Sequence, residues 1–178
     1  MLSQPPRRLL LALGLAPLLG ACAHVPPSAA SGMHAALRPY AAGTVHGVLQ
    51  LRADGGSVTI TGEVVGLRPG GHHGIHVHLN GDCSGTDGSA AGPHFNPGGA
   101  AHGDPASTAH LGDLGNLVAD SRGVATVDIV RPGASLAPGE HSFAGHSIVV
   151  HADADDLHSQ PAGNSGARVA CGVIVAGS

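Results

Sequence analysis

The 178-residue sequence predicts an all-β fold, a Greek-key β-sandwich or flattened barrel of about eight antiparallel strands with two long functional loops. Three observations support this prediction. Apolar and polar residues alternate with period two over several short segments. Glycine (29 residues) and proline (13 residues) are abundant, which favours many short connections over a helical bundle. The sequence contains no convincing helical pattern of apolar residues and no internal repeat.

The predicted strands begin with a hairpin. Residues 44–51 alternate between apolar and polar side chains, turn formers occupy 54–56, and residues 58–65 continue the alternation. Further strands are expected at five segments: 74–78, 117–120, 124–130, 147–151 and 169–175. Two long glycine-rich connections remain, at 79–116 and 152–167, and connections of this length in a compact domain are usually functional.

The N-terminus has the pattern of an export signal over residues 1–21. Arg7 and Arg8 precede an apolar run of roughly eleven residues, too short for a stable bilayer span, and small residues follow. The stretch 19–22 resembles the bacterial lipobox, so we expect acylation of Cys22; the alternative is an ordinary signal with an unrelated cysteine. Residues 22–41 are expected to form a flexible tether outside the fold, and residues 42–178 the folded domain. The predicted location is the cell envelope, lipid-anchored to a membrane and facing the periplasm or the exterior.

Charge and cysteine content indicate which binding partners and which cellular compartment to expect. All eight cations are arginine and the formal charge is −4, so there is no basic stripe for nucleic acid. If Cys22 carries lipid, Cys83 and Cys171 remain as an even pair suited to a disulfide in an oxidising compartment. Closing so long a loop would stabilise the domain by roughly 4–5 kcal/mol in the chain-entropy model. The alternative is two separate buried thiols.

Fourteen histidines, beside one tyrosine, two phenylalanines and no tryptophan, point to metal binding. His76 and His78 flank Val77 on a predicted strand, where residues i and i+2 share a face and two imidazoles can converge on one ion. Four further candidates lie along the first long connection, a set suited to tetrahedral zinc: His94, His102, His110 and Asp113. His151 ends the apolar strand before the second long connection.

The segments that carry these residues resemble the copper–zinc superoxide dismutase family, in its bacterial exported lipoprotein form. The matching segments follow the family's order: 74–78, 92–97, 110–116, 149–157 and 166–172. The resemblance begins near residue 42 and continues to the C-terminus, and Cys83 stands eleven residues before His94, as in bacterial members.

The resemblance implies a role for each candidate residue. The implied copper ligands are His76, His78, His94 and His151, and the implied zinc ligands are His94, His102, His110 and Asp113. His94 would bridge the two ions as an imidazolate, and Asp155 would hold the free ring nitrogens of His76 and His102. Arg168 matches the arginine beside the open copper position, so Arg168 and His94 are the expected catalytic residues, and Cys83 and Cys171 match the family's disulfide.

The implied activity is dismutation of superoxide to dioxygen and hydrogen peroxide, which would protect the cell envelope from oxidative damage. The alternatives are an envelope copper- and zinc-binding lipoprotein without turnover and a metal-free relative used for interaction. A homodimer of bacterial type and a monomer both stay open. Superoxide is an anion, yet residues 157–167 contain no lysine or arginine, so steering should depend on Arg168 and the metals. His73 is expected to be a hydrogen-bonded structural ring; the remaining histidines have no assigned role: His24, His34, His46, His72, His141, His146 and His158.

Overall fold

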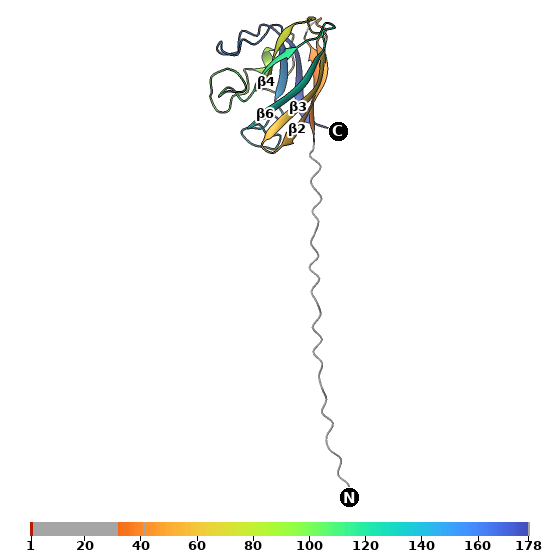
Figure 1. Ribbon diagram of the computed structural model, residues 1–178, viewed down its shortest axis with the longest axis vertical. Helices are drawn as coiled ribbons and strands as arrows, with labels where there is room; N and C mark the ends of the chain where they lie inside the picture. The colour runs from red at the N-terminus through yellow and green to blue at the C-terminus, as the bar shows by residue number, and fades with distance from the viewer. Residues whose placement is uncertain (2–31, 41, 178) are drawn as a thin grey trace.

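The computed structural model describes residues 1, 32–40 and 42–177 of the chain (Figure 1). Its strands are β1 (Met33–Pro39), β2 (His46–Asp54), β3 (Ser57–Val65), β4 (His72–His78), β5 (Asp113–Val118), β6 (Ala125–Pro132), β7 (Ser147–His151) and β8 (Arg168–Ala176). A short 3-10 turn, η1 (Ser89–Ala91), lies between β4 and β5. No helix within these residues has the length and apolar character needed to cross a bilayer. The predicted signal, beyond its first residue, and Cys22 lie outside the described residues.

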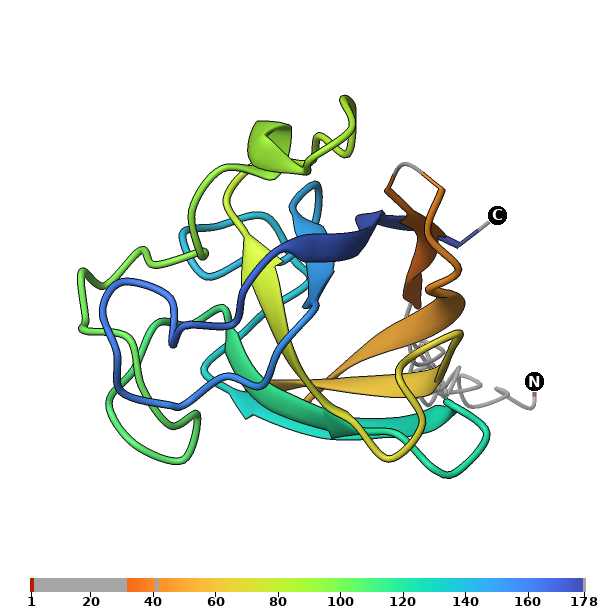
Figure 2. The same ribbon diagram turned by 90° about the horizontal axis from the view of Figure 1, so that it is seen from above.

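The strands join in the order β5-β4-β7-β8-β1-β2-β3-β6, and each neighbouring pair is antiparallel. β5 and β6, at the two ends of this order, also contact each other, so the sheet curls into a nearly closed barrel (Figure 2). The pairs β3–β6, β4–β7 and β8–β1 join strands that are not consecutive, as in a Greek key. The all-β prediction of about eight antiparallel strands is confirmed.

Strand alternation separates the core from the metal-ligand candidates. On β4, Ile75 and Val77 point into the hydrophobic core, where β7 contributes Ile148 and Val150. His76 and His78 therefore occupy the opposite face of β4, yet both are fully buried. The two long loops, 79–112 and 152–167, lie on the same side of the barrel and cover this face (Figure 2).

The predicted tether is too long, because part of it forms strand β1. Residues 33–39 were expected outside the fold, but they form a strand between β2 and β8, with Ala35 opposite Leu49 and Ile174. Ala35 and Leu37 are buried and alternate with the more exposed His34, Ala36 and Arg38. Alanine on both faces gives little hydrophobic contrast, so the alternation was too weak to indicate a strand. Residues 22–31 of the predicted tether lie outside the described residues.

Boundaries of several other strands also differ from the prediction. β4 begins at His72 rather than 74, β6 extends to Pro132, and β5 covers Asp113–Val118 rather than 117–120. The first long connection thus ends at residue 112, and Asp113 is a strand residue. β5 forms by antiparallel pairing with β4. The register of this pair shifts between Gly74 and His76, an irregularity of the kind often found next to active sites. β7 and the second connection match the prediction.

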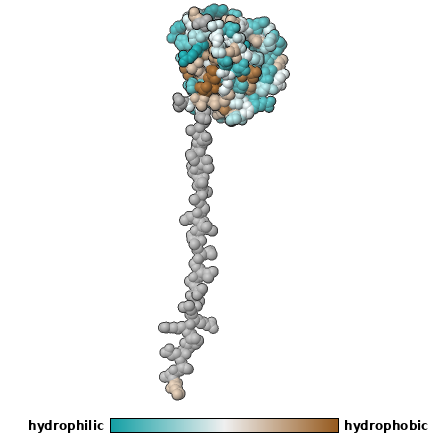
Figure 3. All heavy atoms as spheres, turned by 180° about the vertical axis from the view of Figure 1, so that it is seen from behind, coloured by the Kyte–Doolittle hydropathy of each residue, from teal (hydrophilic) through white to brown (hydrophobic). Residues whose placement is uncertain are grey.

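The predicted disulfide between Cys83 and Cys171 is present, with Cα atoms 5.7 Å apart and a sequence separation of 88 residues. It ties the start of the first long loop to β8. The surface of the domain is mixed in polarity (Figure 3). Besides Met1, the exposed large apolar side chains are Val48, Leu79, Val118, Val130 and Val175. They come from five different segments, and single exposed apolar residues are common on protein surfaces.

Candidate metal centre

Backbone pairing delivers His94 to the end of β4. The amide N–H of Leu79 donates to the carbonyl of Pro93 (2.8 Å), and that of Phe95 donates to the carbonyl of Val77 (2.8 Å). His94 thereby forms an isolated antiparallel bridge with His78. A loop residue is in this way held as firmly as a strand residue, beside the two histidines of β4.

The first cluster comprises four buried histidines whose candidate ligand atoms lie within 4.8 Å of one another: His76, His78, His94 and His151. The Nε2 atoms of His78 and His151 are 3.4 Å apart. The rings of His76 and His94 stack with centroids 3.9 Å apart. All four residues come from the neighbouring strands β4 and β7 or from the segment paired with β4, so the barrel itself holds this cluster.

The second cluster shares His94 and adds His102, His110 and Asp113. One carboxylate oxygen, Oδ1 of Asp113, lies 2.8 Å from Nδ1 of His94, 3.1 Å from Nδ1 of His102 and 3.2 Å from Nδ1 of His110. Two ligand atoms of a tetrahedral zinc ion lie roughly 3.3 Å apart, given bonds of about 2.0 Å. These spacings match the edges of such a site.

The remaining nitrogens test whether the residues fit metal ions. Nδ1 of His76, Nε2 of His94 and Nδ1 of His102 are buried and have no partner in hydrogen-bond geometry, although Oδ1 of Asp113 lies 3.1 Å from the last of them. Buried polar atoms are normally paired, so three unpaired imidazole nitrogens in one place need an explanation. A metal ion in each cluster supplies it. His94 belongs to both clusters and turns Nδ1 toward Asp113, which leaves Nε2 for the first cluster.

Burial sets the protonation of these groups. Desolvation lowers the pKa of His78 to about 2 and that of His151 to about 4, and it lowers the pKa of His76 well below its usual value. For Asp113, burial acts to raise the pKa, but the hydrogen bond to His94 and the other nearby donors bring it below its usual range. His76, His78 and His151 are therefore neutral and Asp113 is ionised near neutral pH, which are the forms that bind metal.

Asp155 connects the two clusters by a second route. Its Oδ2 lies 2.8 Å from Nε2 of His76, and its Oδ1 lies 2.9 Å from Nε2 of His102. Asn116 fixes Asp155 through two hydrogen bonds, since its Oδ1 accepts from the backbone N–H (2.7 Å) and its Nδ2 donates to the carbonyl (2.9 Å). Asp155 thus contacts the ring nitrogens of His76 and His102 that face away from the cluster centres.

Arg168 faces the first cluster. Its Nη2 donates to the carbonyl of Gly92 (2.6 Å), and its Nη1 donates to the carbonyl of Gly88. The same Gly92 oxygen accepts from Nδ1 of His78 (2.8 Å). Burial is the largest cause of the lowered pKa values of His78 and His151, and the positive charge of Arg168 is a smaller cause that acts in the same direction. The guanidinium is therefore close enough to interact electrostatically with both rings.

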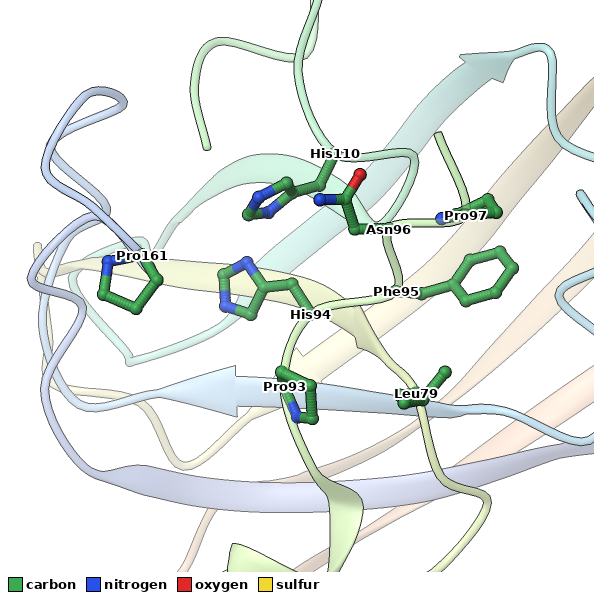
Figure 4. A pocket seen from close by; sticks show the side chains of 8 residues that line it. All are labelled: Leu79, Pro93, His94, Phe95, Asn96, Pro97, His110 and Pro161. Atoms are coloured by element: carbon green, nitrogen blue, oxygen red, sulfur yellow. The ribbon is translucent and has the colours of Figure 1, made fainter. Parts of the chain in front are cut away.

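Open space lies beside the shared histidine. A cavity of about 470 Å³ is lined by His94, His110 and neighbours on the first loop, with Pro161 from the second loop (Figure 4). Both imidazole rings point toward Pro161 (Figure 4). A smaller cavity of about 160 Å³ touches His151 and is lined otherwise by residues 160–166. The second loop therefore borders the approach to both sides of the centre.

Two residues that support the site were missed in the sequence. Gln160 pairs with the backbone of His102, as its Oε1 accepts from the N–H (2.9 Å) and its Nε2 donates to the carbonyl (2.9 Å). Arg131 binds the backbone near His110. Gln160 could not have been recognised in the sequence, because its partner His102 lies 58 residues away. Arg131 could have been recognised. It continues the inward-facing positions 125, 127 and 129 of a strand, where an apolar residue is expected.

The other histidines lie outside both clusters. As expected, His73 is hydrogen-bonded, with Nδ1 2.9 Å from the carbonyl oxygen of His151. His146 packs against Phe95 with centroids 4.1 Å apart. The rest of the described histidines belong to neither group: His34, His46, His72, His141 and His158. His24 is outside the described residues.

Comparison with known proteins agrees with this geometry. Residues 43–174 match the family described as copper/zinc superoxide dismutase. An extracellular copper–zinc superoxide dismutase of Brugia pahangi is 46% identical over 143 residues, 74% of this chain and 70% of the relative. A copper–zinc superoxide dismutase of Onchocerca volvulus is 45% identical over 148 residues, 76% of this chain and 91% of the relative.

Two solved structures resemble the fold. A double mutant of a superoxide dismutase-like protein from Bacillus subtilis is 34% identical, with a TM-score of 0.73, and the match covers 80% of this chain and 96% of the other. The clock protein EA4 is 37% identical, with a TM-score of 0.74, and the match covers 86% of this chain and 99% of the other. The fold of the chain is therefore shared with proteins of known structure.

Proposed function

The chain belongs to the copper/zinc superoxide dismutase family, and we propose that its two side-chain clusters form one centre that dismutates superoxide. Copper and zinc are the metals of this family, and both clusters can hold a metal ion. In our proposal His76, His78, His94 and His151 bind copper, and His94, His102, His110 and Asp113 bind zinc. His94 then bridges the ions as an imidazolate. The membership of His94 in both clusters is the observation that carries this assignment.

The chemistry divides between the metals and the chain. Bound copper supplies the one-electron oxidation of one superoxide and the one-electron reduction of another, and bound zinc supplies a fixed positive charge. Forming hydrogen peroxide also consumes two protons. His94 would carry one of them on Nε2 only when that atom has left copper, since no described protein group bonds to it there, while Nδ1 stays directed at the second cluster.

Arg168 is the residue that we propose for substrate capture. Its guanidinium is fixed by the carbonyls of Gly88 and Gly92 beside the first cluster and remains partly exposed. A fixed positive charge at this position attracts the superoxide anion and orients it. A metal buffer without turnover has no use for such a cation, which favours the enzyme over that alternative.

We also propose that the protein acts outside the cytoplasm, with Cys22 as the point of lipid attachment in a cell envelope. The disulfide between Cys83 and Cys171 supports an oxidising compartment. The relative from Brugia pahangi, named as an extracellular enzyme, supports export. Mass spectrometry of the mature protein tests this directly, since acylation at Cys22 adds a defined lipid mass and an uncleaved or differently cleaved chain contradicts it.

The decisive experiment for the activity measures superoxide loss by the metal-loaded protein. We expect rapid, copper-dependent loss that His151→Ala abolishes. His46→Ala is the matched control, because His46 is exposed and belongs to neither cluster. Tight binding of both metals without turnover would overturn the proposal in favour of a metal-binding protein.

A further inference from the structure

Arg131 is a buried cation at the end of β6. Positions 125, 127, 129 and 131 share one side of this strand, and the first three are apolar. Arg131 is only 6% exposed, and none of the salt bridges among the described residues includes it. Burying an unpaired charge costs free energy unless hydrogen bonds replace its hydration. The position therefore needs a reason.

Three backbone carbonyls of the first long loop surround the guanidinium. Nε donates to the carbonyl of Leu111 (2.9 Å), Nη2 to that of His110 (2.8 Å) and Nη1 to that of Pro105 (2.5 Å). A planar guanidinium with several N–H groups in fixed directions suits such a three-point contact, and a lysine ammonium does not. Arg131 thus fastens both ends of the segment 105–111 to the barrel.

The same segment carries one residue of the second cluster, His110, and ends two residues before another, Asp113. The carbonyl of His110 also accepts from the N–H of Asp113 (3.1 Å), and the N–H of His110 donates to Oδ2 of Asp113 (3.1 Å). The turn 110–113 is closed by these two contacts. Holding the carbonyls of His110 and Leu111 in place therefore sets where the His110 ring and the Asp113 carboxylate point.

We propose that Arg131 is a positioning residue for the zinc half of the centre, which it preorganises by holding segment 105–111 against β6. This inference rests on the zinc ligand set proposed above. Arg131 makes no hydrogen bond to the strands that carry His76, His78 and His151. Its effect is therefore larger on zinc than on copper, which it reaches only through the shared His94.

Electrostatic repulsion acts in the opposite direction. A guanidinium near Asp113 opposes the approach of a divalent cation, so removing Arg131 would strengthen zinc binding if charge alone mattered. The dipoles of the three carbonyl groups point toward the guanidinium and offset much of its positive charge. Without Arg131, these buried carbonyl oxygens would lose hydrogen-bond donors, which costs free energy. Preorganisation dominates, and zinc binding is weaker without Arg131.

The test compares Arg131→Gln and Arg131→Lys with Arg122→Gln, which removes the same charge from an exposed turn. Zinc and copper affinities are measured by chelator competition, and cobalt(II) placed in the second cluster reports ligand geometry through its visible absorption. We expect Arg131→Gln to weaken zinc binding by about 10- to 100-fold and to reduce the tetrahedral cobalt absorption. Copper affinity should fall much less than zinc affinity, Arg131→Lys should lie between Arg131→Gln and the parent, and Arg122→Gln should match the parent.

Amide hydrogen exchange on the metal-free proteins keeps the test decisive if Arg131→Gln folds poorly. In Arg131→Lys, faster exchange confined to residues 103–112 supports the inference, and a uniform increase overturns it. Unchanged or tighter zinc binding overturns it too, as does an equal loss of zinc and copper. If the parent protein binds no zinc through these ligands, the proposed function fails together with the inference; if the parent binds zinc and the variants bind it equally, only the inference fails.

Discussion

His78 and Arg168 donate hydrogen bonds to the same atom, the carbonyl oxygen of Gly92, over 2.8 Å and 2.6 Å respectively. The same backbone carbonyl thus positions both a proposed copper ligand and the proposed substrate-binding cation. The disulfide at Cys83 ties the loop that carries Gly92 to β8, and Arg168 begins that strand. The covalent link therefore helps to keep ligand and cation at a constant separation.

Replacing Arg168 should reduce the rate without reducing metal binding. We expect Arg168→Gln to lower kcat/KM for superoxide by about tenfold or more, since a fixed charge at the site raises the capture rate of an anion. Copper content should be unchanged, because Arg168 provides no atom to either cluster. Pulse radiolysis on the metal-loaded protein measures the rate, with Arg122→Gln as the control for loss of charge. An Arg168→Gln enzyme as fast as the parent would show that capture does not use this residue.

The rate should depend weakly on salt. The segment between Leu157 and Ala167 has no lysine or arginine, so the attraction of superoxide comes mainly from Arg168 and the bound metals at short range. Screening by salt acts most strongly on charges further away than a Debye length of about 10 Å at 0.1 M. Measuring kcat/KM across ionic strength checks this, and a steep fall would reveal long-range steering by other groups.

Asp155 should matter for both metals, because its two oxygens each face a ring nitrogen from a different cluster. In Asp155→Asn one oxygen becomes an NH₂ group, which is a donor and cannot accept from a second ring N–H. We expect copper and zinc affinities to fall together, by about 10- to 100-fold. Asp153→Asn, at an exposed neighbouring position, is the control. A loss confined to one metal would show that Asp155 does not join the two clusters.

The metal-free protein should lose stability below neutral pH. Burial holds the pKa values of His78 and His151, at about 2 and about 4, below the value of about 6.5 expected in the unfolded chain. Above pH 6.5 neither state binds these protons. Below it the unfolded state binds more, so the free energy of unfolding falls by about 1.4 kcal/mol per pH unit for each histidine until its folded pKa is reached. Urea unfolding between pH 8 and pH 5 measures this slope, and stability that is constant or rises toward pH 5 would contradict it.

The sequence predicted the parts of the molecule that strong local patterns encode. The alternation in β2 and β3 and the apolar run in β7 marked those strands, and the segments around His76, His94 and His151 identified the clusters. β1 was missed because its Ala-rich pattern gains its strand character only from pairing with β2 and β8 on both sides. The start of β5 at Asp113 likewise depends on β4.

Supporting contacts were harder to predict than ligands. Gln160 and Arg131 act through backbone atoms of distant loop residues, and a backbone carbonyl has no signature in the sequence. Of these two residues, Arg131 could have been suspected from the sequence. A charged residue at an inward-facing position of β6 conflicts with the alternation of that strand.

The central claim is that the single ring of His94 joins two metal ions. Copper(II) in the first cluster and cobalt(II) in the second would then be magnetically coupled through the imidazolate, since His94 offers one nitrogen to each. Electron paramagnetic resonance of this mixed-metal protein is the most direct test. We predict that the copper signal seen with zinc in the second cluster is strongly diminished when cobalt replaces zinc; a copper signal of full intensity would contradict the bridge.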